Sequence, residues 1–366
     1  MAPLKDALGP DAARRLAGEL SRAWPGFPVR RFTRGLAGTL EPLELLARGA
    51  ALSARLAATL PPAFTEAETV LRAALDSPTF TGWIVLPCGG FVARAGIDDP
   101  SRSLPLLADL TPRWSSEFAI RPFIERHPEP TYECLREWVT HDDEHVRRLV
   151  SEGTRPRLPW APQLRRLVAD PAPNVPLLDA LVQDRSPYVR RSVANHLNDI
   201  AKDHADLALD LAAGWARRGD GASAVVRHGL RTLVKRGDDR ALRLVGATVD
   251  GDIELRGLSA APARIAAGDA VTFTFTLAVP ANGTRSIDTV IDYRVHYIGA
   301  RGEANAPRVF KLTRRRLAAG DVVTFRRRHR FENVSIRRIH PGTHTIDVQV
   351  NGRILGTTIV VVVPGR

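Results

Sequence analysis

The sequence has few of the residues from which disulfide-bonded and metal-binding domains are built. Its 366 residues include only two cysteines, Cys88 and Cys134, and neither lies near other metal-ligand residues at the spacing of a zinc site. We therefore expect no disulfide framework, no metal site and no cofactor. No P-loop, glycine-rich nucleotide fingerprint or zinc-deaminase spacing is present, so the sequence gives no support to an ATPase, an oxidoreductase or a zinc deaminase.

Long apolar runs are also missing. No run reaches the roughly 18 residues that a membrane-spanning helix requires. Residues 1–20 carry six charged side chains where a signal peptide would have an apolar segment. We expect a cytoplasmic protein with no membrane partner. The composition, with 44% hydrophobic and 25% charged residues, is typical of a folded protein, and the chain is long enough to form two domains.

The excess of positive charge is concentrated in the C-terminal third. Residues 257–366 contain 17 Lys+Arg and 7 Asp+Glu, whereas residues 1–256 contain 35 and 33. Basic side chains displace condensed counterions from a nucleic-acid backbone, so this region predicts phosphate contacts. A soluble basic surface or a docking surface for an acidic protein is the alternative. The predicted phosphate contacts are Arg314, Arg315 and Arg316, together with Arg326, Arg327 and Arg328.

A repeated pattern in the first part of the chain ends each time in a Val-Arg-Arg helix. The two copies begin at Val146 and Val189, 43 residues apart, which is within the range of HEAT-like repeats. A weaker third copy around Val226 follows 37 residues later. Such repeats stack helix pairs into an α-solenoid with a concave binding surface.

A helical wheel separates the apolar and polar residues of both copies. In the first copy Val146, Leu149, Val150 and Gly153 share one side. The opposite side carries Arg148, Ser151, Glu152 and Arg155 in the first copy, and Arg191, Asn195, Asn198 and Lys202 in the second, with Asp199 on the flank. The wheel therefore predicts that Glu152 is not a core residue of its helix. A solvated face with weak i,i+4 ion pairs is the alternative interpretation.

The residue pattern changes from helical spacing to period two at about residues 249–258. Alternation predicts strands near residues 271–277, 291–297, 308–312, 322–331, 343–350 and 354–363. Asn351-Gly352 is a two-residue hairpin signal between the last two. About seven strands in roughly 110 residues fit an immunoglobulin-like β-sandwich. We expect a HEAT-like domain over residues 1–250 and a basic sandwich over residues 257–366.

Three segments, residues 115–123, 144–160 and 188–204, closely resemble the AlkC DNA glycosylases, bacterial alkylation-repair proteins of the HEAT-like superfamily. The resemblance covers roughly residues 1–250, and the appended sandwich resembles the larger of the family's two architectures. It implies a monofunctional hydrolase that excises 3-methyladenine, and also 3-methylcytosine, from double-stranded DNA. It implies a monomer that needs no cofactor and no obligate protein partner.

The resemblance also assigns roles to individual residues. Glu117, Glu152 and Asp199 occupy the catalytic-pocket positions of the family. An N3-methylated base is cationic and leaves without protonation, so carboxylates can stabilise an oxocarbenium-like sugar and direct a water. Arg148 and Arg155 would hold phosphates around the lesion and keep Glu152 ionised. Arg191 and Lys202 are also expected to contact DNA. Trp160 would present its ring to the cationic sugar or base.

Each role has a structural alternative. Glu117 is four residues before Arg121 and could form an ion pair with it, and Asp199 could pair with Lys202. Trp160 could fill a loop between repeats. For the whole chain, the alternatives are a non-catalytic HEAT-repeat protein that binds DNA and a scaffold that binds an acidic protein.

Overall fold

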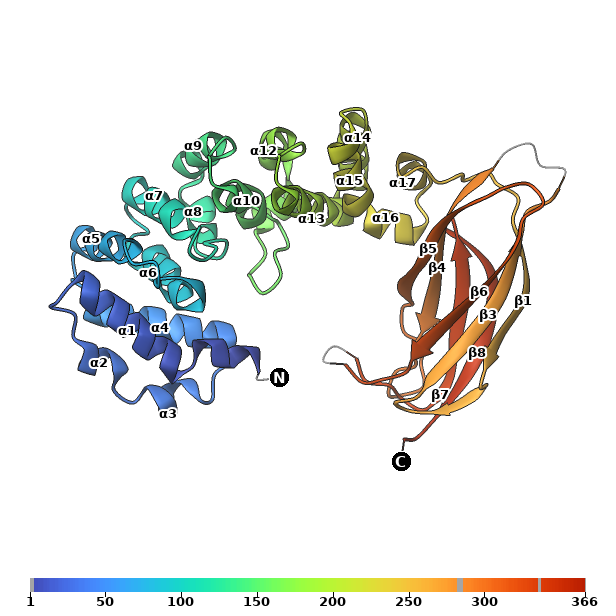
Figure 1. Cartoon of the computed structure of the whole chain (residues 1–366), viewed down its shortest axis with the longest axis horizontal. Coiled ribbons are helices and arrows are strands. Elements are labelled where there is room, and N and C mark those ends of the chain that lie inside the picture. Colours follow the sequence, from blue (N-terminus) through green and yellow to red (C-terminus); the bar gives the residue numbers. More distant parts are fainter. Residues whose placement is uncertain (1–2, 282–285, 335–336, 366) are drawn as a thin grey trace. The chain divides into compact units, whose positions relative to one another are not determined.

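The computed structural model describes residues 3–281, 286–334 and 337–365 (Figure 1). The chain forms two compact units, Met1–Asp203 and His204–Arg366. Among the described residues, no helix is both long and apolar enough to cross a membrane.

Every described element of the first unit is a helix. The 3-10 helices are η1 (Leu4–Leu8), η2 (Gly82–Val85) and η3 (Ala172–Asn174). The α-helices are α1 (Pro10–Ala23), α2 (Val29–Thr33), α3 (Leu36–Leu40), α4 (Leu45–Thr59), α5 (Phe64–Leu75), α6 (Leu86–Ala95), α7 (Pro100–Leu110), α8 (Arg121–Arg126), α9 (Pro128–Trp138), α10 (Glu144–Gly153), α11 (Arg165–Ala169), α12 (Val175–Leu181) and α13 (Pro187–Asp203). Successive pairs stack, with α9 and α12 in one row and α10 and α13 in the row beneath (Figure 1). The predicted α-solenoid of HEAT-like repeats is confirmed.

The two Val-Arg-Arg copies form equivalent structures in α10 and α13. The valine that opens each copy is buried. Nη1 of Arg147 donates to the carbonyls six and five residues earlier, at 2.7 and 2.8 Å. Nη1 of Arg190 donates to carbonyls at the same two offsets, at 2.5 and 3.1 Å. The first arginine of each copy therefore anchors the preceding turn, and the second, Arg148 or Arg191, is left for another role.

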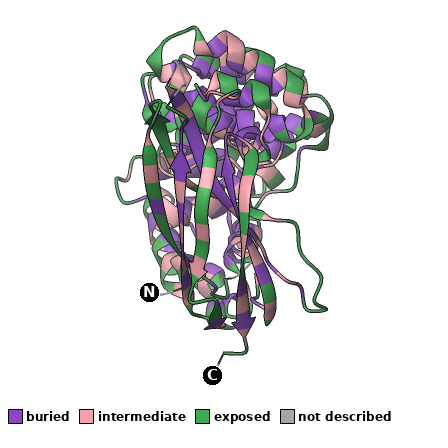
Figure 2. Ribbon diagram, turned by 90° about the vertical axis from the view of Figure 1, so that its right-hand side faces the viewer, coloured by how far each residue is buried: buried purple, intermediate pink, exposed green. Residues whose placement is uncertain are grey.

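The second unit begins with helices and continues as a β-sandwich. The helices are α14 (Ala205–Ala216), α15 (Asp220–Gly229), α16 (Arg231–Arg236) and α17 (Asp239–Leu244). The strands are β1 (Glu254–Ala261), β2 (Arg264–Ala266), β3 (Ala270–Ala278), β4 (Ile287–His296), β5 (Arg308–Leu317), β6 (Val322–Arg330), β7 (Gly342–Val350) and β8 (Arg353–Val363). One sheet has the order β1-β3-β6 and the other β2-β8-β7-β4-β5. Buried residues such as Phe273, Phe275 and Ile346 form its core. Figure 2 shows in purple where the strands are buried.

The six strands predicted individually correspond to β3–β8. The alternation rule missed β1 and β2. A bulge between Arg256 and Ser259 interrupts β1, so its side chains do not alternate regularly between core and solvent. β2 is only three residues long. The immunoglobulin-like fold class is confirmed.

The hairpin turn between β7 and β8 also joins the sandwich to the preceding helices. Asn351 and Gly352 have φ angles of 44° and 81°, as a two-residue hairpin turn of this kind requires. A Cβ atom on Gly352 would lie 2.5 Å from the Cα atom of Gly237, so the two backbones can approach only as glycines. This contact helps to group α14–α17 with the strands. The change from helix to strand falls between Leu244 and Glu254, and the predicted domain boundary at residues 250–257 stays a prediction.

Candidate functional site

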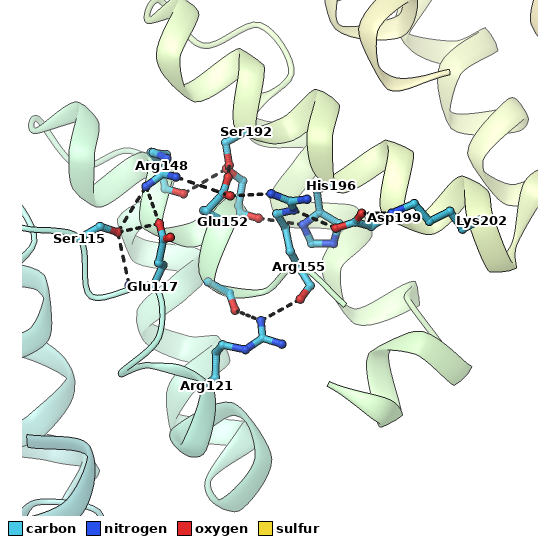
Figure 3. Close-up of polar contacts among 12 residues, drawn as sticks. Ser115, Glu117, Arg121, Arg148, Glu152, Arg155, Ser192, His196, Asp199 and Lys202 are labelled. Carbon is cyan, nitrogen blue, oxygen red and sulfur yellow. Dashed lines mark hydrogen bonds and ion pairs between the residues drawn. The ribbon is translucent and has the colours of Figure 1, made fainter. Parts of the chain in front are cut away.

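A chain of alternating acidic and basic side chains runs across α10 and α13 in the first unit (Figure 3). Each acid is in contact with at least one base, and the arginines each bridge two acids. In order, the members are Glu117, Arg148, Glu152, Arg155, Asp199 and Lys202. All three predicted catalytic acids therefore belong to one cluster, although 82 positions separate the first from the last in sequence.

Glu117 lies at the outer end of this cluster, in the segment before α8. Its Oε2 atom accepts hydrogen bonds from Arg148 Nη1 at 2.7 Å and from Ser115 Oγ at 3.0 Å. The alternative pairing with Arg121 is wrong. Arg121 is buried at the start of α8 and donates to the backbone carbonyls of Gly153, Arg155 and Pro162 at 3.0, 2.8 and 2.7 Å.

Glu152 is buried at the centre of the cluster, with 5% of its surface exposed. Its Oε1 atom lies 2.6 Å from Arg155 Nη1 and 3.5 Å from Arg148 Nη2. Its Oε2 atom accepts a hydrogen bond of 2.7 Å from Ser192 Oγ on α13. The prediction that Glu152 is not a core residue of its helix is wrong, because α13 packs against this side of α10 and both Glu152 and Ser151 are buried.

Asp199 lies at the inner end, on α13, and is 1% exposed. Its Oδ2 atom accepts from Arg155 Nε at 2.8 Å, and its Oδ1 atom accepts from Lys202 Nζ at 2.9 Å. The pair with Lys202 that we expected as an alternative therefore exists within the cluster. Burial opposes the charged form of Arg155, but its hydrogen bond to Asp199 and the charge of Glu152 outweigh burial and raise the pKa of the guanidinium.

A buried, neutral histidine, His196, lies next to the acidic and basic side chains of this cluster. Tyr132 Oη donates to Asn174 Oδ1 at 2.7 Å, which orients the amide so that Asn174 Nδ2 donates to His196 Nε2 at 3.2 Å. His196 Nδ1 therefore carries the proton and donates to the carbonyl of Ser151 at 2.9 Å. Burial lowers the pKa of His196 to about 4. His196 is thus a neutral part of the scaffold at pH 7, and sequence reasoning missed it.

A cavity of about 450 Å³ opens beside the outer half of the cluster. Glu117, Arg148 and Glu152 line it, whereas Asp199 and Arg155 do not. Half of its other lining residues are aromatic, namely Trp83, Trp114, Phe118, His145, Trp160 and Tyr188, and the rest include Arg113. A neighbouring, mostly apolar cavity of about 350 Å³ also has Trp114 and Trp160 in its wall, but neither Glu117 nor Glu152 lines it. The larger cavity is therefore the candidate active site.

The aromatic residues of this cavity come from distant parts of the chain. The rings of Trp83 and Trp114 lie 4.4 Å apart between centroids. Trp160 follows α10, is 64% exposed and has a φ angle of 68°, so it does not fill a space between repeats. Sequence reasoning missed Trp83, Trp114 and Tyr188. The small number of tryptophans could have pointed to them. The chain has six tryptophans, and three of them line this cavity.

The predicted phosphate-binding residues differ in their surroundings. Arg191 and Lys202 have exposed side chains on α13. Arg155 is buried between two acids, which favours a positioning role over a phosphate contact. The two arginine triplets of the sandwich are exposed on β5 and β6, the edge strands of their sheets. The triplet of β5 also lines a cavity of about 230 Å³ with residues 245–247.

The donor set does not suit a metal ion. Within residues 3–281, 286–334 and 337–365, no group of three His, Cys, Asp or Glu side chains is placed to hold one. In the acidic cluster each carboxylate is already in contact with a guanidinium or ammonium group.

Relatives match this chain along nearly its whole length. The solved structure of Pseudomonas fluorescens alkylpurine DNA glycosylase AlkC, bound to DNA containing an abasic site analog, is similar with a TM-score of 0.94 and 35% identity, over 99% of this chain and 100% of that chain. The uncharacterized protein YhaZ of Bacillus subtilis is 34% identical over 355 residues, 97% of this chain and 98% of YhaZ. Residues 254–364 match the C-terminal Ig-like domain family of YhaZ. The resemblance to AlkC found in the sequence is confirmed, and the chain belongs to the family of AlkC and YhaZ.

Proposed function

We propose that the protein is a monofunctional DNA glycosylase that hydrolyses the glycosidic bond of cationic N3-methylated bases, 3-methyladenine and 3-methylcytosine, in duplex DNA. The observation that carries this proposal is the pair of carboxylates, Glu117 and Glu152, held by arginines at the wall of an aromatic-lined cavity. Similarity over the full length to an alkylpurine DNA glycosylase supports it. We assign the glycosylase to residues 1–250 and a DNA clamp to residues 257–366.

The charge of the lesion explains why such a site suffices. An N3-methylated base leaves with the electron pair of the glycosidic bond and becomes neutral, so no acid has to protonate it. Positive charge meanwhile develops on the sugar, where fixed carboxylates stabilise it. Glu117 and Glu152 are both in contact with arginines, and as carboxylates they carry the negative charge that this role requires.

The surroundings of the two carboxylates suggest a division of labour. Glu152 accepts hydrogen bonds at both oxygen atoms and is almost fully enclosed. Glu117 is more accessible, with 16% of its side chain exposed, and no described residue donates a hydrogen bond to its Oε1 atom. Glu117 Oε1 is therefore the oxygen that accepts the proton of the attacking water, and Glu152 stabilises the sugar cation. Asp199 acts through Arg155, which it holds in place.

The aromatic wall complements the carboxylates. Trp160 and Tyr188 are exposed at the cavity and offer ring faces to a cationic nucleotide. Arg191 and Lys202, with the triplets of β5 and β6, supply positive charge for the phosphate backbone. The partner is double-stranded DNA, bound by a monomer.

The direct test is release of free base. Purified full-length protein is incubated with duplex DNA treated with a methylating agent, and the released bases are separated by chromatography. We expect 3-methyladenine as the main product. DNA binding without any base release would instead support the non-catalytic DNA-binding alternative, and the absence of both would support a protein scaffold.

A further inference from the structure

Arg148 occupies the space between the two carboxylates that line the candidate active site. Its Nη1 atom lies 2.7 Å from Glu117 Oε2 and its Nη2 atom lies 3.5 Å from Glu152 Oε1 (Figure 3). Burial opposes its charged form, but the two carboxylates outweigh burial and raise the pKa of the guanidinium. A permanent cation therefore already stands where the proposed reaction needs negative charge.

This arrangement conflicts with the proposed chemistry as long as Arg148 stays in place. The cluster has three acids and three bases and is formally neutral. A sugar cation that approached Glu117 would be attracted by the carboxylate and repelled by the guanidinium at a similar distance. The charged side chains that line the cavity, Glu117, Glu152, Arg148 and Arg113, also sum to zero, so the departure of Arg148 would leave a net negative charge at its wall.

The surroundings of Arg155 hold it in place, whereas those of Arg148 allow it to move. Arg155 uses Nε and Nη1 on two buried acids, and 8% of its side chain is exposed. Arg148 lines the open cavity, with twice that exposure, 16%. Its Cζ atom also lies 4.9 Å from the ring centroid of Tyr188, an exposed residue, so a cation–π contact can retain the guanidinium when it leaves Glu117.

We propose that Arg148 is a displaceable counter-ion whose place is taken by the cationic lesion nucleotide. When that nucleotide enters, its positive charge replaces the guanidinium at Glu117, and Arg148 moves towards the DNA phosphates along the ring of Tyr188. A neutral nucleotide cannot make this exchange, because it would leave a carboxylate in a confined site without a counter-charge. Arg148 thereby competes with the lesion cation for Glu117, whereas a neutral nucleotide leaves the contact between Arg148 and Glu117 in place. This inference rests on the proposed function.

The test compares affinities for three duplexes that differ at one nucleotide. One contains a cationic pyrrolidine analogue of the abasic sugar, one contains the neutral tetrahydrofuran analogue, and one is undamaged. The measured quantity is the ratio of the Kd for the neutral analogue to the Kd for the cationic analogue. In Arg148→Gln this ratio should rise about tenfold or more, since the cation no longer competes with a charge-assisted partner of Glu117. Arg148→Lys keeps a cation and should return the ratio towards that of the unaltered protein.

Arg191→Gln is the matched control, because Arg191 occupies the equivalent repeat position and its exposed side chain is outside the acidic cluster. It should weaken binding to all three duplexes by the same factor and leave the ratio unchanged. The same uniform weakening in Arg148→Gln would overturn the inference, as would a fall in the ratio.

A second measurement needs no variant at Arg148. Crystal structures of the unaltered protein with the cationic and the neutral duplex should show Arg148 away from Glu117 in the first and bound to it in the second. Contact with Glu117 in both complexes would contradict the exchange. Failure of the proposed function is distinguishable, because in that case the unaltered protein releases no methylated base at all.

Discussion

Replacing Glu152 by glutamine should abolish most base release while leaving the protein folded and able to bind duplex DNA. Glutamine has nearly the same shape and can still accept the hydrogen bond from Ser192. It removes one negative charge from a cluster that is formally neutral, so the pocket that must receive a cation becomes positive. Arg155 keeps its contact with Asp199, which limits the structural damage.

The expected loss of activity is larger than the expected loss of stability. Removing one preorganised group that stabilises developing charge typically lowers the rate by about 10²–10³-fold, and we expect a single-turnover rate lower by that factor. Losing one charge-assisted hydrogen bond costs about 1.5–3 kcal/mol of unfolding free energy. Single-turnover release of 3-methyladenine, thermal unfolding and duplex affinity are measured on the same preparation.

Glu68→Gln is the matched control. Glu68 is also a buried acid between two arginines, with Arg72 at 2.8 Å and Arg102 at 3.2 Å, but it lies on α5 and does not line the cavity. The Glu68→Gln variant should lose about as much unfolding free energy as Glu152→Gln and should keep the single-turnover rate of the unaltered protein. A Glu152→Gln variant with the rate of the unaltered protein would refute the role of Glu152, and an equal loss in Glu68→Gln would show that the effect is structural.

Further predictions concern the rest of the molecule. Asp199→Asn should slow base release less than Glu152→Gln, because Asp199 acts through Arg155; an unchanged single-turnover rate would remove it from the site. Replacing Arg314, Arg315 and Arg316 by alanine should weaken binding to every duplex and lower the slope of log affinity against log salt by roughly 0.9 for each lost phosphate contact. An unchanged slope would exclude that triplet, and the same result for residues 326–328 would favour a protein partner. The unfolding free energy should fall as the pH drops from 6.5 towards about 4. In this pH range His196 is protonated in the unfolded protein but stays neutral in the folded protein. Chemical denaturation at several pH values should show a weaker decline for His196→Gln, and an equal decline would refute that origin.

Much of the fold could be predicted because its signals are local. The apolar stripe at Val146, Leu149 and Val150 specifies a packed helix, and the alternation from Val271 to Leu277 specifies a half-buried strand. Asn351-Gly352 fixes a hairpin because both positions need positive φ angles. Where local alternation fails, as in the bulged strand β1, the sequence pattern fails with it.

The site was predictable only in part. The acids were identified by the resemblance of their segments to a known family, but a wheel drawn for α10 alone cannot show that α13 covers Glu152. Arg121 illustrates the same difficulty. Its spacing from Glu117 favoured an ion pair, yet three backbone carbonyls from residues more than 30 positions away bind it instead. Such contacts depend on the stacking of repeats, which no short segment encodes.

The most direct test of the proposed mechanism is a comparison of base release from duplexes that each contain one modified base. A site that relies on fixed carboxylates and on the charge of the lesion should release 3-methyladenine and 3-methylcytosine. It should leave uracil and hypoxanthine in place, because those neutral bases need a general acid to leave. 7-Methylguanine, whose methyl group lies in the major groove, should be a poorer substrate. Efficient excision of uracil or hypoxanthine would contradict the electrostatic mechanism and would require a proton donor in the site.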